Sequence, residues 1–291
     1  MNAAYAVGAD VGGTRARALL TREGRELARG EAGGGNLRHV GPTAVVESVV
    51  AATAAAFEAA NLPLDLGACA VHAGVAGLAT PADEAALQAA PHPFARLTAQ
   101  SDAFLALGAH FGGESGVLLI VGTGCIALAR GQDGRIHRRL GWGFPLEEGG
   151  GADLGLRALR LGLRDWENGE RTFVAQALAG EFAAPRALIE WARGQTPGGF
   201  ARFAPLLFEA VAQGDGRAQS AVRAWGEACG DAVRALQEEA GVTRWGAHGG
   251  LAPRLPLASR PTPPAQPRHS PVAWAAELAR RAPERGEGQA F

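Results

Sequence analysis

The chain has 291 residues, 47% of them hydrophobic, and its 28 basic and 29 acidic residues leave a formal net charge of −1. This length and apolar fraction predict a large core and two lobes, whereas the balanced charge favours neither nucleic acid nor an anionic membrane as a partner. All basic residues are arginines, so the sequence lacks the lysine that a P-loop, a protein kinase or a Schiff-base enzyme requires.

The sequence also predicts a cytoplasmic protein. Residues 1–13 carry no basic segment of the kind that begins a signal peptide, and Asp10 and several glycines interrupt their apolar stretch. No run of eighteen apolar residues occurs, so we expect no membrane span. The three cysteines are isolated in the sequence, which argues against a disulfide framework and against a CxxC metal or cluster site.

The first part of the chain predicts three strands followed by alternating helices and strands. Residues 6–20 read AVGADVGGTRARALL, two apolar strands joined by a glycine turn, and a third strand is expected near 26–32. Further strands are expected over 66–75 and 97–99, and helical spacing predicts helices over 44–60, 80–90 and 103–111. This order is typical of one α/β lobe.

A similar order restarts at residue 117. Residues 117–130 read VLLIVGTGCIALAR, a second hairpin, which we expect to be followed by a polar loop and the glycine-rich segment GWGFPLEEGGGADLG. The remaining expected elements are helices to about residue 239, a poor strand over 243–248, an irregular proline-rich crossover over 256–271, a closing helix over 272–281 and a frayed tail over 283–291.

The turns of the two hairpins have matching contexts. Glycine lets backbone N–H groups approach an anion without a Cβ in the way, and a threonine hydroxyl adds one more donor. Two such turns are suited to hold a polyphosphate from both sides. The candidate phosphate-binding residues are therefore Gly12, Gly13, Thr14, Gly122, Thr123 and Gly124.

Two aspartates are the candidate charged groups. Asp10 ends the first strand beside a glycine turn, where it is either a turn-forming residue or a holder of Mg²⁺, an ion that keeps several waters and uses few carboxylates. Asp102 precedes an apolar helix, where it either caps the helix, as Ser101 also can, or takes a proton from a substrate hydroxyl as general base. The local pattern leaves both alternatives open.

Residues in the glycine-rich loops are candidate sugar contacts. Asn36 follows three glycines and either forms a turn or offers an amide donor and acceptor to sugar hydroxyls. Trp142 lies between two glycines, so its indole has little local packing and either forms one wall of a sugar site or packs between lobes. Glu147 and Glu148 precede three glycines, where they are either solvated, metal ligands or sugar ligands.

One further glycine pair completes the set. Gly249 and Gly250 follow the last expected strand and predict a third turn of close approach, suited to an adenosine. The histidines have no HExxH or other ligand spacing, and no serine lies in a GxSxG motif, so a zinc enzyme and a serine hydrolase are disfavoured.

Taken in order, these segments resemble a known family. DVGGT at 10–14, the Asn36 loop, Asp102-Ala103, VGTG at 121–124, GWG…EEGGG at 141–151 and GG at 249–250 resemble the sugar-kinase branch of the actin/Hsp70/hexokinase superfamily, in particular the BadF/BadG-type ATPases that include N-acetylglucosamine kinases. The segments HPFARLTAQSDA, FPLEEGGG and SPVAWAAELA are most similar to those of bacterial glucosamine kinases.

The resemblance implies an α/β fold of two ribonuclease-H-like lobes with an interlobe cleft that closes on ATP and sugar. The lobes are expected at 1–107 and 108–271, with a helix at about 272–285 packing back on the first. By the same resemblance the two Gly–Thr turns contact phosphate, Asp10 helps to hold Mg²⁺ and Asp102 is the base. The remaining implied contacts are Asn36, Asp102, Trp142 and Glu147 to the sugar, and Gly249 and Gly250 to the adenosine.

The sequence departs from the family pattern at three positions. Val11 replaces a glycine of DGGGT, which should matter little because Gly12 and Gly13 remain. Glu147 stands where the family commonly has the aspartate of DEGSG, and Gly150 replaces its serine. A longer carboxylate could shift sugar or metal geometry by about an ångström, and misplacement of that size can cost roughly 10²-fold in rate.

The sequence therefore predicts an ATP- and Mg²⁺-dependent kinase of an amino sugar, with glucosamine at its 6-hydroxyl as the favoured substrate, since Glu147 or Glu148 could pair with a free ammonium. The alternative substrate is N-acetylglucosamine. A non-catalytic sugar sensor and an ATPase activator of a radical dehydratase are less favoured, the latter because paired cysteines are missing. The expected partners are small molecules, without nucleic acid or membrane, and a homodimer is a possible assembly.

Overall fold

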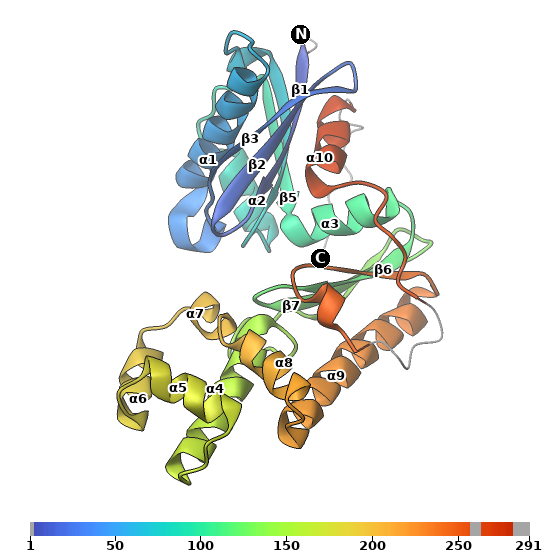
Figure 1. Ribbon diagram of the computed structural model, residues 1–291. Helices are drawn as coiled ribbons and strands as arrows, with labels where there is room; N and C mark the ends of the chain where they lie inside the picture. Colours follow the sequence, from blue (N-terminus) through green and yellow to red (C-terminus); the bar gives the residue numbers. More distant parts are fainter. Residues whose placement is uncertain (1–2, 257–262, 282–291) are drawn as a thin grey trace. The chain divides into compact units, whose positions relative to one another are not determined.

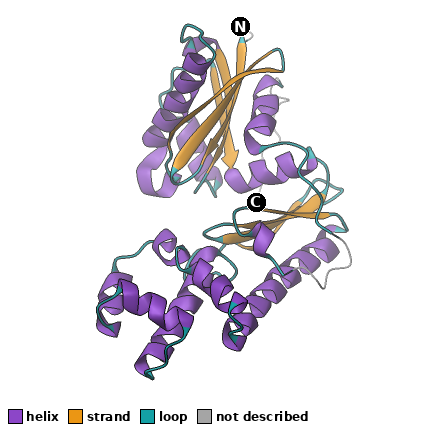
Figure 2. Cartoon of the chain, viewed as in Figure 1, coloured by secondary structure: helices purple, strands orange, loops and turns teal. Residues whose placement is uncertain are grey.

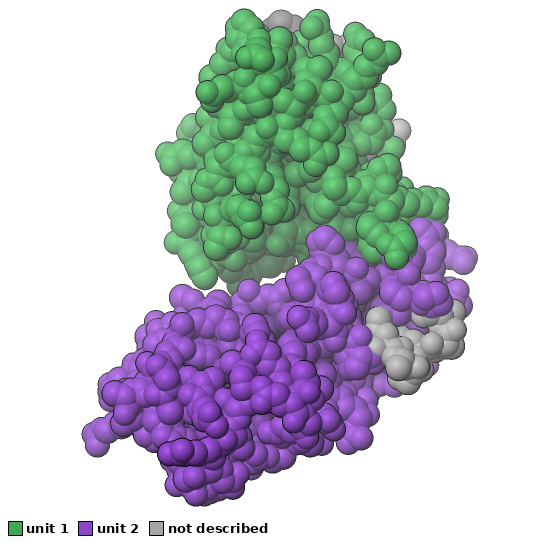
Figure 3. Space-filling model, viewed as in Figure 1, with its two compact units in different colours: residues 1–114, 266–291 green, residues 115–265 purple. Residues whose placement is uncertain are grey.

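The computed structural model describes residues 3–256 and 263–281 and divides the chain into two compact units, residues 1–114 with 266–291 and residues 115–265 (Figure 3). The expected boundaries after 107 and 271 differ from these. Residue 107 lies inside helix α3, Asp102–Phe111, whose side chains Leu105 and Ala109 pack on the last helix of the same unit. The boundary therefore comes after that helix is complete.

Unit 1 is built on a five-stranded sheet with the order β3-β2-β1-β4-β5. Its strands are β1 Tyr5–Val11, β2 Arg15–Arg22, β3 Arg25–Gly33, β4 Cys69–Val75 and β5 Arg96–Ser101. The first three strands are antiparallel, and β4 and β5 run parallel to β1 (Figure 1). This register places Asp10 level with Gly74 on β4 and Gln100 on β5, so the end of β5 and the start of α3 adjoin the end of β1.

Helices cover both faces of this sheet (Figure 2). Helix α1, Leu37–Ala59, packs on β2 and β3, and α10, Pro271–Arg280, packs on β1 and β4 beside α3; α2, Pro81–Gln88, lies near β5. Two glycines allow these close approaches. A Cβ on Gly8 would lie 2.0 Å from the Val272 carbonyl oxygen of α10, and one on Gly30 would lie 2.2 Å from the Ala52 carbonyl oxygen of α1.

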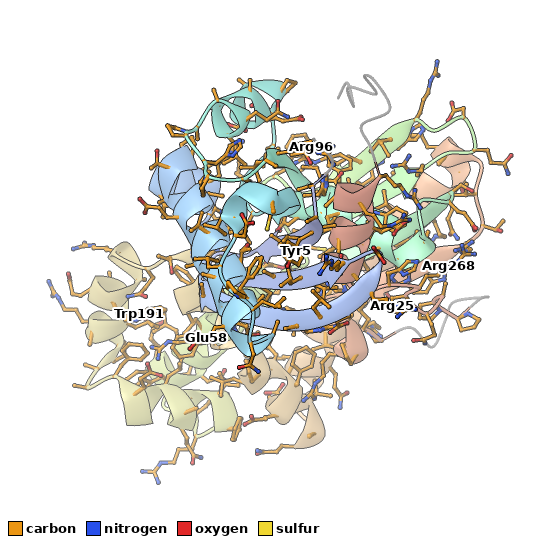
Figure 4. The ribbon with its side chains drawn as sticks, turned by 90° about the horizontal axis from the view of Figure 1, so that it is seen from above. Tyr5, Arg25, Glu58, Arg96, Trp191 and Arg268 are labelled. Atoms are coloured by element: carbon orange, nitrogen blue, oxygen red, sulfur yellow. The ribbon has the colours of Figure 1, made fainter. Side chains whose placement is uncertain are left out.

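Side-chain contacts tie the helices to strand ends in unit 1. The Tyr5 ring at the start of β1 meets the Phe57 ring of α1 edge-on, with 5.1 Å between centroids. Arg96 at the start of β5 donates from Nη2 to the Ala279 carbonyl of α10 at 2.6 Å, and Figure 4 labels both Tyr5 and Arg96. The sheet thus lies between α1 and α10. Loops cover the edge at which β1, β4 and β5 end.

Unit 2 repeats the plan on a four-stranded sheet with the order β8-β7-β6-β9. Its strands are β6 Gly116–Val121, β7 Cys125–Arg130, β8 Ile136–Leu140 and β9 Trp245–His248, of which β9 is parallel to β6. In both units a three-stranded antiparallel meander is extended beside its first strand by a parallel strand. This is the ribonuclease-H-like order, and it confirms the α/β fold class that the sequence predicts.

The helices of unit 2 pack around a core of leucines and aromatic rings. They are α4 Gly151–Glu167, α5 Phe173–Glu181, α6 Pro185–Arg193, α7 Pro197–Ala201, α8 Ala204–Ala212 and α9 Gly216–Ala240. Trp225 of α9 is fully buried, as the helical spacing predicts, and its Nε1 donates to the Gly149 carbonyl at 2.7 Å. A core side chain thereby holds the glycine-rich loop that precedes α4.

The structure corrects several expected elements. The expected polar loop after the second hairpin contains strand β8, whose sequence IHRRL lies at the sheet edge and needs no apolar face. The expected strand over 66–75 begins only at Cys69, because a 3₁₀ turn occupies Leu66–Ala68. The crossover residues 257–262, the tail and the end of the closing helix beyond 281 lie outside the described residues.

Helix α1 begins seven residues earlier than the expected residue 44. Asn36 caps it, and a kink at Gly41, where φ is +80°, allows the helix to continue through Pro42. Within the described part of the chain, α1 is the one helix long and apolar enough to cross a membrane by length and composition. In unit 1 it is a packing helix, with Val45, Val49 and Ala52 among its buried residues.

Candidate active site

The first Gly–Thr turn joins β1 to β2 and leaves its tip open. The Gly12 N–H donates to the Arg15 carbonyl at 2.9 Å, and the Gly35 N–H donates to the Gly12 carbonyl at 3.0 Å, which holds the turn from one side. No atom lies within 4 Å of where a Gly13 Cβ would be. Within the described residues, the N–H groups of Gly13 and Thr14 have no acceptor, so two consecutive donors remain for an anion.

Asp10 and Asp102 lie at the same edge and on the same face of the unit 1 sheet. Asp10 is level with Gly74 on β4, and a Cβ at Gly74 would meet the Leu105 side chain of α3, so this face of the sheet is the one that α3 covers. Asp102 is the first residue of α3, and its Oδ1 accepts from the Ala103 N–H at 2.8 Å. Ser101 caps the helix, also toward Ala103, at 3.2 Å.

The two carboxylates act on each other electrostatically. Burial raises the pKa of Asp10 above its ordinary 3.8 and the negative charge of Asp102 raises it further, while Arg17 opposes both effects. Burial also raises the pKa of Asp102, against the lowering effect of the Ala103 amide and the Ser101 hydroxyl. No described group donates a hydrogen bond to Asp10. A cation beside this pair would relieve both the repulsion and the desolvation.

The side-chain oxygen of Asn36 caps the N-terminus of α1. Its Oδ1 accepts from the Arg38 N–H at 3.1 Å, and the side chain occupies the space that a Cβ on Gly77 would need, 2.2 Å from that position. Gly77 has a φ of +84°, which favours glycine independently. The capping role and the predicted sugar contact are compatible, because Nδ2 has no acceptor within the described residues.

The second Gly–Thr turn joins β6 to β7 and is tied to the start of α4. The Gly151 and Ala152 N–H groups of α4 donate to the carbonyls of Gly122 and Thr123 at 2.8 and 2.9 Å. Two of the donors that a helix N-terminus leaves free therefore hold the turn. The N–H groups of Thr123 and Gly124 have no acceptor in residues 3–256 and 263–281, so this turn also presents two consecutive donors.

Glu147, for which the family resemblance implies a contact to the sugar, is buried under the second turn. The residue is only 7% exposed. Its Oε1 accepts from the Cys125 N–H, and its Oε2 accepts from the Gly143 N–H at 3.2 Å. Hydrogen bonds to a charged group are worth about 1.5–3 kcal/mol each. Both oxygens thus hold backbone groups of unit 2.

Trp142 is left at the surface of the same loop. The residue is 74% exposed, and the Arg138 guanidinium lies over its ring at 5.3 Å from the centroid. Arg138 also donates to the Leu140 carbonyl at 3.2 Å and to the Gly141 carbonyl. The loop therefore presents an oriented aromatic face, which is suited to the apolar face of a sugar ring.

Gly249 and Gly250 form a turn directly after β9. Gly249 has a φ of +101°, and its Cβ would lie 2.4 Å from the Val121 carbonyl oxygen, so no other residue fits without a shift of the backbone. Gly250 lines a pocket of about 350 Å³ in unit 2 together with Pro205, Phe208, Glu209, Ala212, Leu251 and Arg254. The Arg254 guanidinium lies 5.4 Å from the Phe208 ring centroid. The pocket is large enough for a nucleoside base and is lined partly by apolar groups.

Comparisons with known proteins identify the family of the chain. The chain matches the BadF/BadG/BcrA/BcrD ATPase family over residues 7–259. It is 33% identical over 221 residues to the glucosamine kinase GspK of Vibrio cholerae, which covers 72% of this chain and 73% of that protein. The chain belongs to the BadF/BadG/BcrA/BcrD ATPase family. The resemblance stated from the sequence motifs is thereby confirmed.

Other proteins and solved structures are similar to the chain over different lengths. The N-acetyl-D-glucosamine kinase of Dictyostelium discoideum is 35% identical over 123 residues, 40% of this chain and 39% of that protein. The crystal structure of a putative N-acetylglucosamine kinase from Chromobacterium violaceum superposes with a TM-score of 0.87 at 29% identity, covering 96% of this chain and 100% of that one. A ROK family glucokinase from Streptomyces griseus, solved with glucose and AMPPNP, has a TM-score of 0.54 at 19% identity, covers 95% of this chain and 99% of that one, and supports the fold alone.

Three residues near the candidate site of this ATPase-family member were not foreseen. Arg17 pairs in register with Asp10 across the first hairpin and lines a pocket of about 370 Å³ with it. The alternation of the expected hairpin strand places Arg17 on the Asp10 face, so the sequence carried that signal. Phe208 and Arg254, beside Gly250, had no comparable signal, because helix α8 reaches the pocket only through the packing of unit 2.

Proposed function

We propose that this protein transfers the γ-phosphoryl group of ATP to the 6-hydroxyl of glucosamine. ATP-dependent phosphorylation of an amino sugar follows from membership of the ATPase family and from the similarity to amino-sugar kinases. The observation that carries the proposal is the pair of Gly–Thr turns, each with two consecutive backbone N–H groups that lack an acceptor within the described residues. Each turn by itself is suited to bind phosphate oxygens.

Asp102 is the proposed general base. In the reaction the O6 oxygen of the sugar forms a bond to the γ-phosphorus, the bond from that phosphorus to the β,γ-bridging oxygen breaks, and ADP leaves. The hydroxyl proton passes to the Asp102 carboxylate. Burial raises the pKa of this group, which increases its affinity for the proton. The Ala103 N–H at 2.8 Å holds one oxygen of the carboxylate in place.

Asp10, beside Asp102, is the proposed holder of Mg²⁺. The residues fit the ion, because Mg²⁺ takes oxygen ligands from few carboxylates and keeps several waters, and because Asp10 and Asp102 repel each other without a cation. When bound, Mg²⁺ would neutralise charge on the phosphates. Asp10 has no hydrogen-bond donor within the described residues, so its oxygens remain available.

The sugar and the adenosine are assigned to the remaining residues. We propose that the Asn36 Nδ2 and the exposed Trp142 face contact the sugar, and that the base of ATP occupies the pocket at Gly250. Backbone amides and the hydroxyls of Thr14 and Thr123 supply the phosphate contacts that a lysine provides in other kinase families. We also propose that the enzyme acts in the cytoplasm, where its nucleotide is supplied.

N-acetylglucosamine is the alternative substrate, since the similarity includes N-acetylglucosamine kinases as well as a glucosamine kinase. Release of ADP, measured with a coupled assay over a panel of hexoses and amino sugars, tests the proposal. We expect the largest kcat/KM for glucosamine. A larger value for the acetylated sugar would move the assignment to the alternative, and no sugar-dependent ADP release with any member of the panel would contradict a kinase.

A further inference from the structure

Within the described part of the chain, Glu147 is the buried carboxylate that joins the second Gly–Thr turn to the loop that holds Trp142. It lies four residues after Gly143 in the Trp142 loop and accepts from that N–H at 3.2 Å. Its other oxygen accepts from Cys125, the first residue of β7 and the end of the second Gly–Thr turn. One side chain therefore links the residues proposed to contact sugar with the residues proposed to contact phosphate.

The space around Glu147 is shaped to receive this side chain. A Cβ on Gly124 would lie 2.8 Å from Oε1, so glycine at this position leaves room for the carboxylate as well as for an anion. The Gly141 N–H donates to the Cys125 carbonyl at 2.9 Å, and the Glu147 N–H donates to the Gly143 carbonyl at 3.0 Å. These backbone hydrogen bonds leave the Cys125 and Gly143 N–H groups without an acceptor. The Glu147 carboxylate accepts from both.

We infer that Glu147 is a positioning residue that couples the phosphate turn to the Trp142 loop, and that it is not the group that recognises the sugar amine. This inference rests on the proposed function for the identity of the two substrates. A carboxylate on a residue that is 7% exposed, with each oxygen already accepting from a backbone amide, is poorly placed to pair with a ligand ammonium. Shifting it instead moves both loops at once.

Glu147→Gln tests the inference with little change of shape. A glutamine offers one oxygen and one NH₂ group, so either the Cys125 N–H or the Gly143 N–H faces another donor. Gly124→Ala is the second variant, because it keeps the carboxylate and displaces it. Glu238→Gln is the matched control: Glu238 is an exposed acid on α9 of the same unit. Thermal unfolding of each variant establishes that the chain is folded.

The measurements are the Kd for Mg·ADP by calorimetry, the KM for sugar, kcat, and the ratio of kcat/KM for glucosamine to that for N-acetylglucosamine. For Glu147→Gln we expect a Kd for Mg·ADP raised about tenfold, a raised sugar KM and a kcat lowered by up to about 10²-fold, with the sugar ratio unchanged. Gly124→Ala should show the same pattern, and Glu238→Gln should match the wild type. If Glu147→Gln does not fold, Glu147→Asp, which keeps the charge but shortens the side chain by one methylene, replaces it with the same expected pattern, because Gly124 itself lies in the phosphate turn.

Two results would overturn the inference. One is a Glu147→Gln variant that binds Mg·ADP like the wild type but loses the preference between the two sugars, which would make Glu147 a sugar ligand. The other is wild-type behaviour in every measurement. Failure of the proposed function is distinguishable, because a wild-type chain that phosphorylates no amino sugar still reports the coupling through its affinity for Mg·ADP.

Discussion

The two Gly–Thr turns come from similar hairpins but are supported in different ways. The first is held by backbone contacts from Gly34 and Gly35, and its tip is open. It lies at the end of β1, next to Asp10. The second is held by the first amides of α4 and by the buried Glu147 side chain. The first turn thus adjoins a pair of carboxylates in which the charge of Asp102 raises the pKa of Asp10, whereas the second is fixed by hydrogen bonds within its own unit.

This difference in support suggests that the two turns bind different parts of the nucleotide. A turn beside two mutually repelling carboxylates is suited to the reacting end of a nucleotide, where charge changes during transfer. A turn locked by a helix start and a carboxylate is suited to bind the part of the nucleotide that does not react. The following predictions test that division, in order of decreasing effect.

Asp102→Asn should have the largest effect on activity. The variant keeps the size of the side chain but cannot accept the proton of the sugar hydroxyl, so we expect kcat to fall by about 10²- to 10⁴-fold. The Kd for Mg·ADP should stay within about threefold of the wild type, because the second turn lies in the other unit. Steady-state kinetics and calorimetry check the two values. A variant with near wild-type kcat would contradict the assignment of the base.

Alanine substitutions of the two glycines after β9 should distinguish the effect of backbone strain on stability from the effect of ligand contact on nucleotide binding. Gly249→Ala places a Cβ 2.4 Å from the Val121 carbonyl at a φ of +101°, so the free energy of unfolding should fall by about 1–3 kcal/mol. Gly250→Ala meets no atom within 4 Å and should leave stability unchanged. Both should weaken nucleotide binding, because Gly250 lines the proposed adenosine pocket and Gly249 precedes it in the same turn. Urea unfolding with and without Mg·ADP distinguishes the effects; equal stabilities for the two variants would contradict the strain.

Much of this arrangement was predictable from local sequence. The two hairpins, the turns and the position of Asp102 at the start of a helix follow from apolar alternation, glycine and an N-cap, all of which act over a few residues. The family resemblance added the order of the segments. Strand β8 was missed because IHRRL lies at a sheet edge, where polar residues are as common as in a loop.

The placement of Glu147 was not predictable in the same way. Its neighbours in sequence are glycines and another glutamate, which is equally typical of a solvated loop and of a ligand site. Its burial depends on Gly124, more than twenty residues earlier, and on the Trp225 indole of α9, which holds Gly149 in place. Such packing between distant segments has no local signature, whereas caps and turns do.

Substitution of the two turn threonines should affect nucleotide affinity in one turn and catalytic rate in the other. Thr123→Val removes a hydroxyl from the locked turn, and we expect the Kd for Mg·ADP to rise about tenfold, the usual loss for a hydrogen bond to a charged group. Thr14→Val removes the same group beside Asp10, and we expect a fall in kcat of similar size with little change in Kd. Calorimetry and initial rates measure both. The opposite assignment of the two effects would reverse the division between the turns.

The smallest effect should be a gain of stability when the carboxylate pair is neutralised. Burial and the charge of Asp102 raise the pKa of Asp10 in the folded chain above 3.8, so between the two pKa values the folded state holds more protons than the unfolded state. The free energy of unfolding therefore decreases as the pH rises through that window.

Asp10→Asn should consequently be more stable than the wild type at pH 7 without Mg²⁺, and the difference should shrink below pH 3.8, where Asp10 is protonated in both states. Glu238→Gln, which removes an exposed charge, serves as the control. Urea unfolding as a function of pH measures the difference. Added Mg²⁺ and ADP should narrow it, because the wild-type carboxylate then gains the cation that the variant cannot hold. A gain of stability that is independent of pH would contradict the repulsion between Asp10 and Asp102.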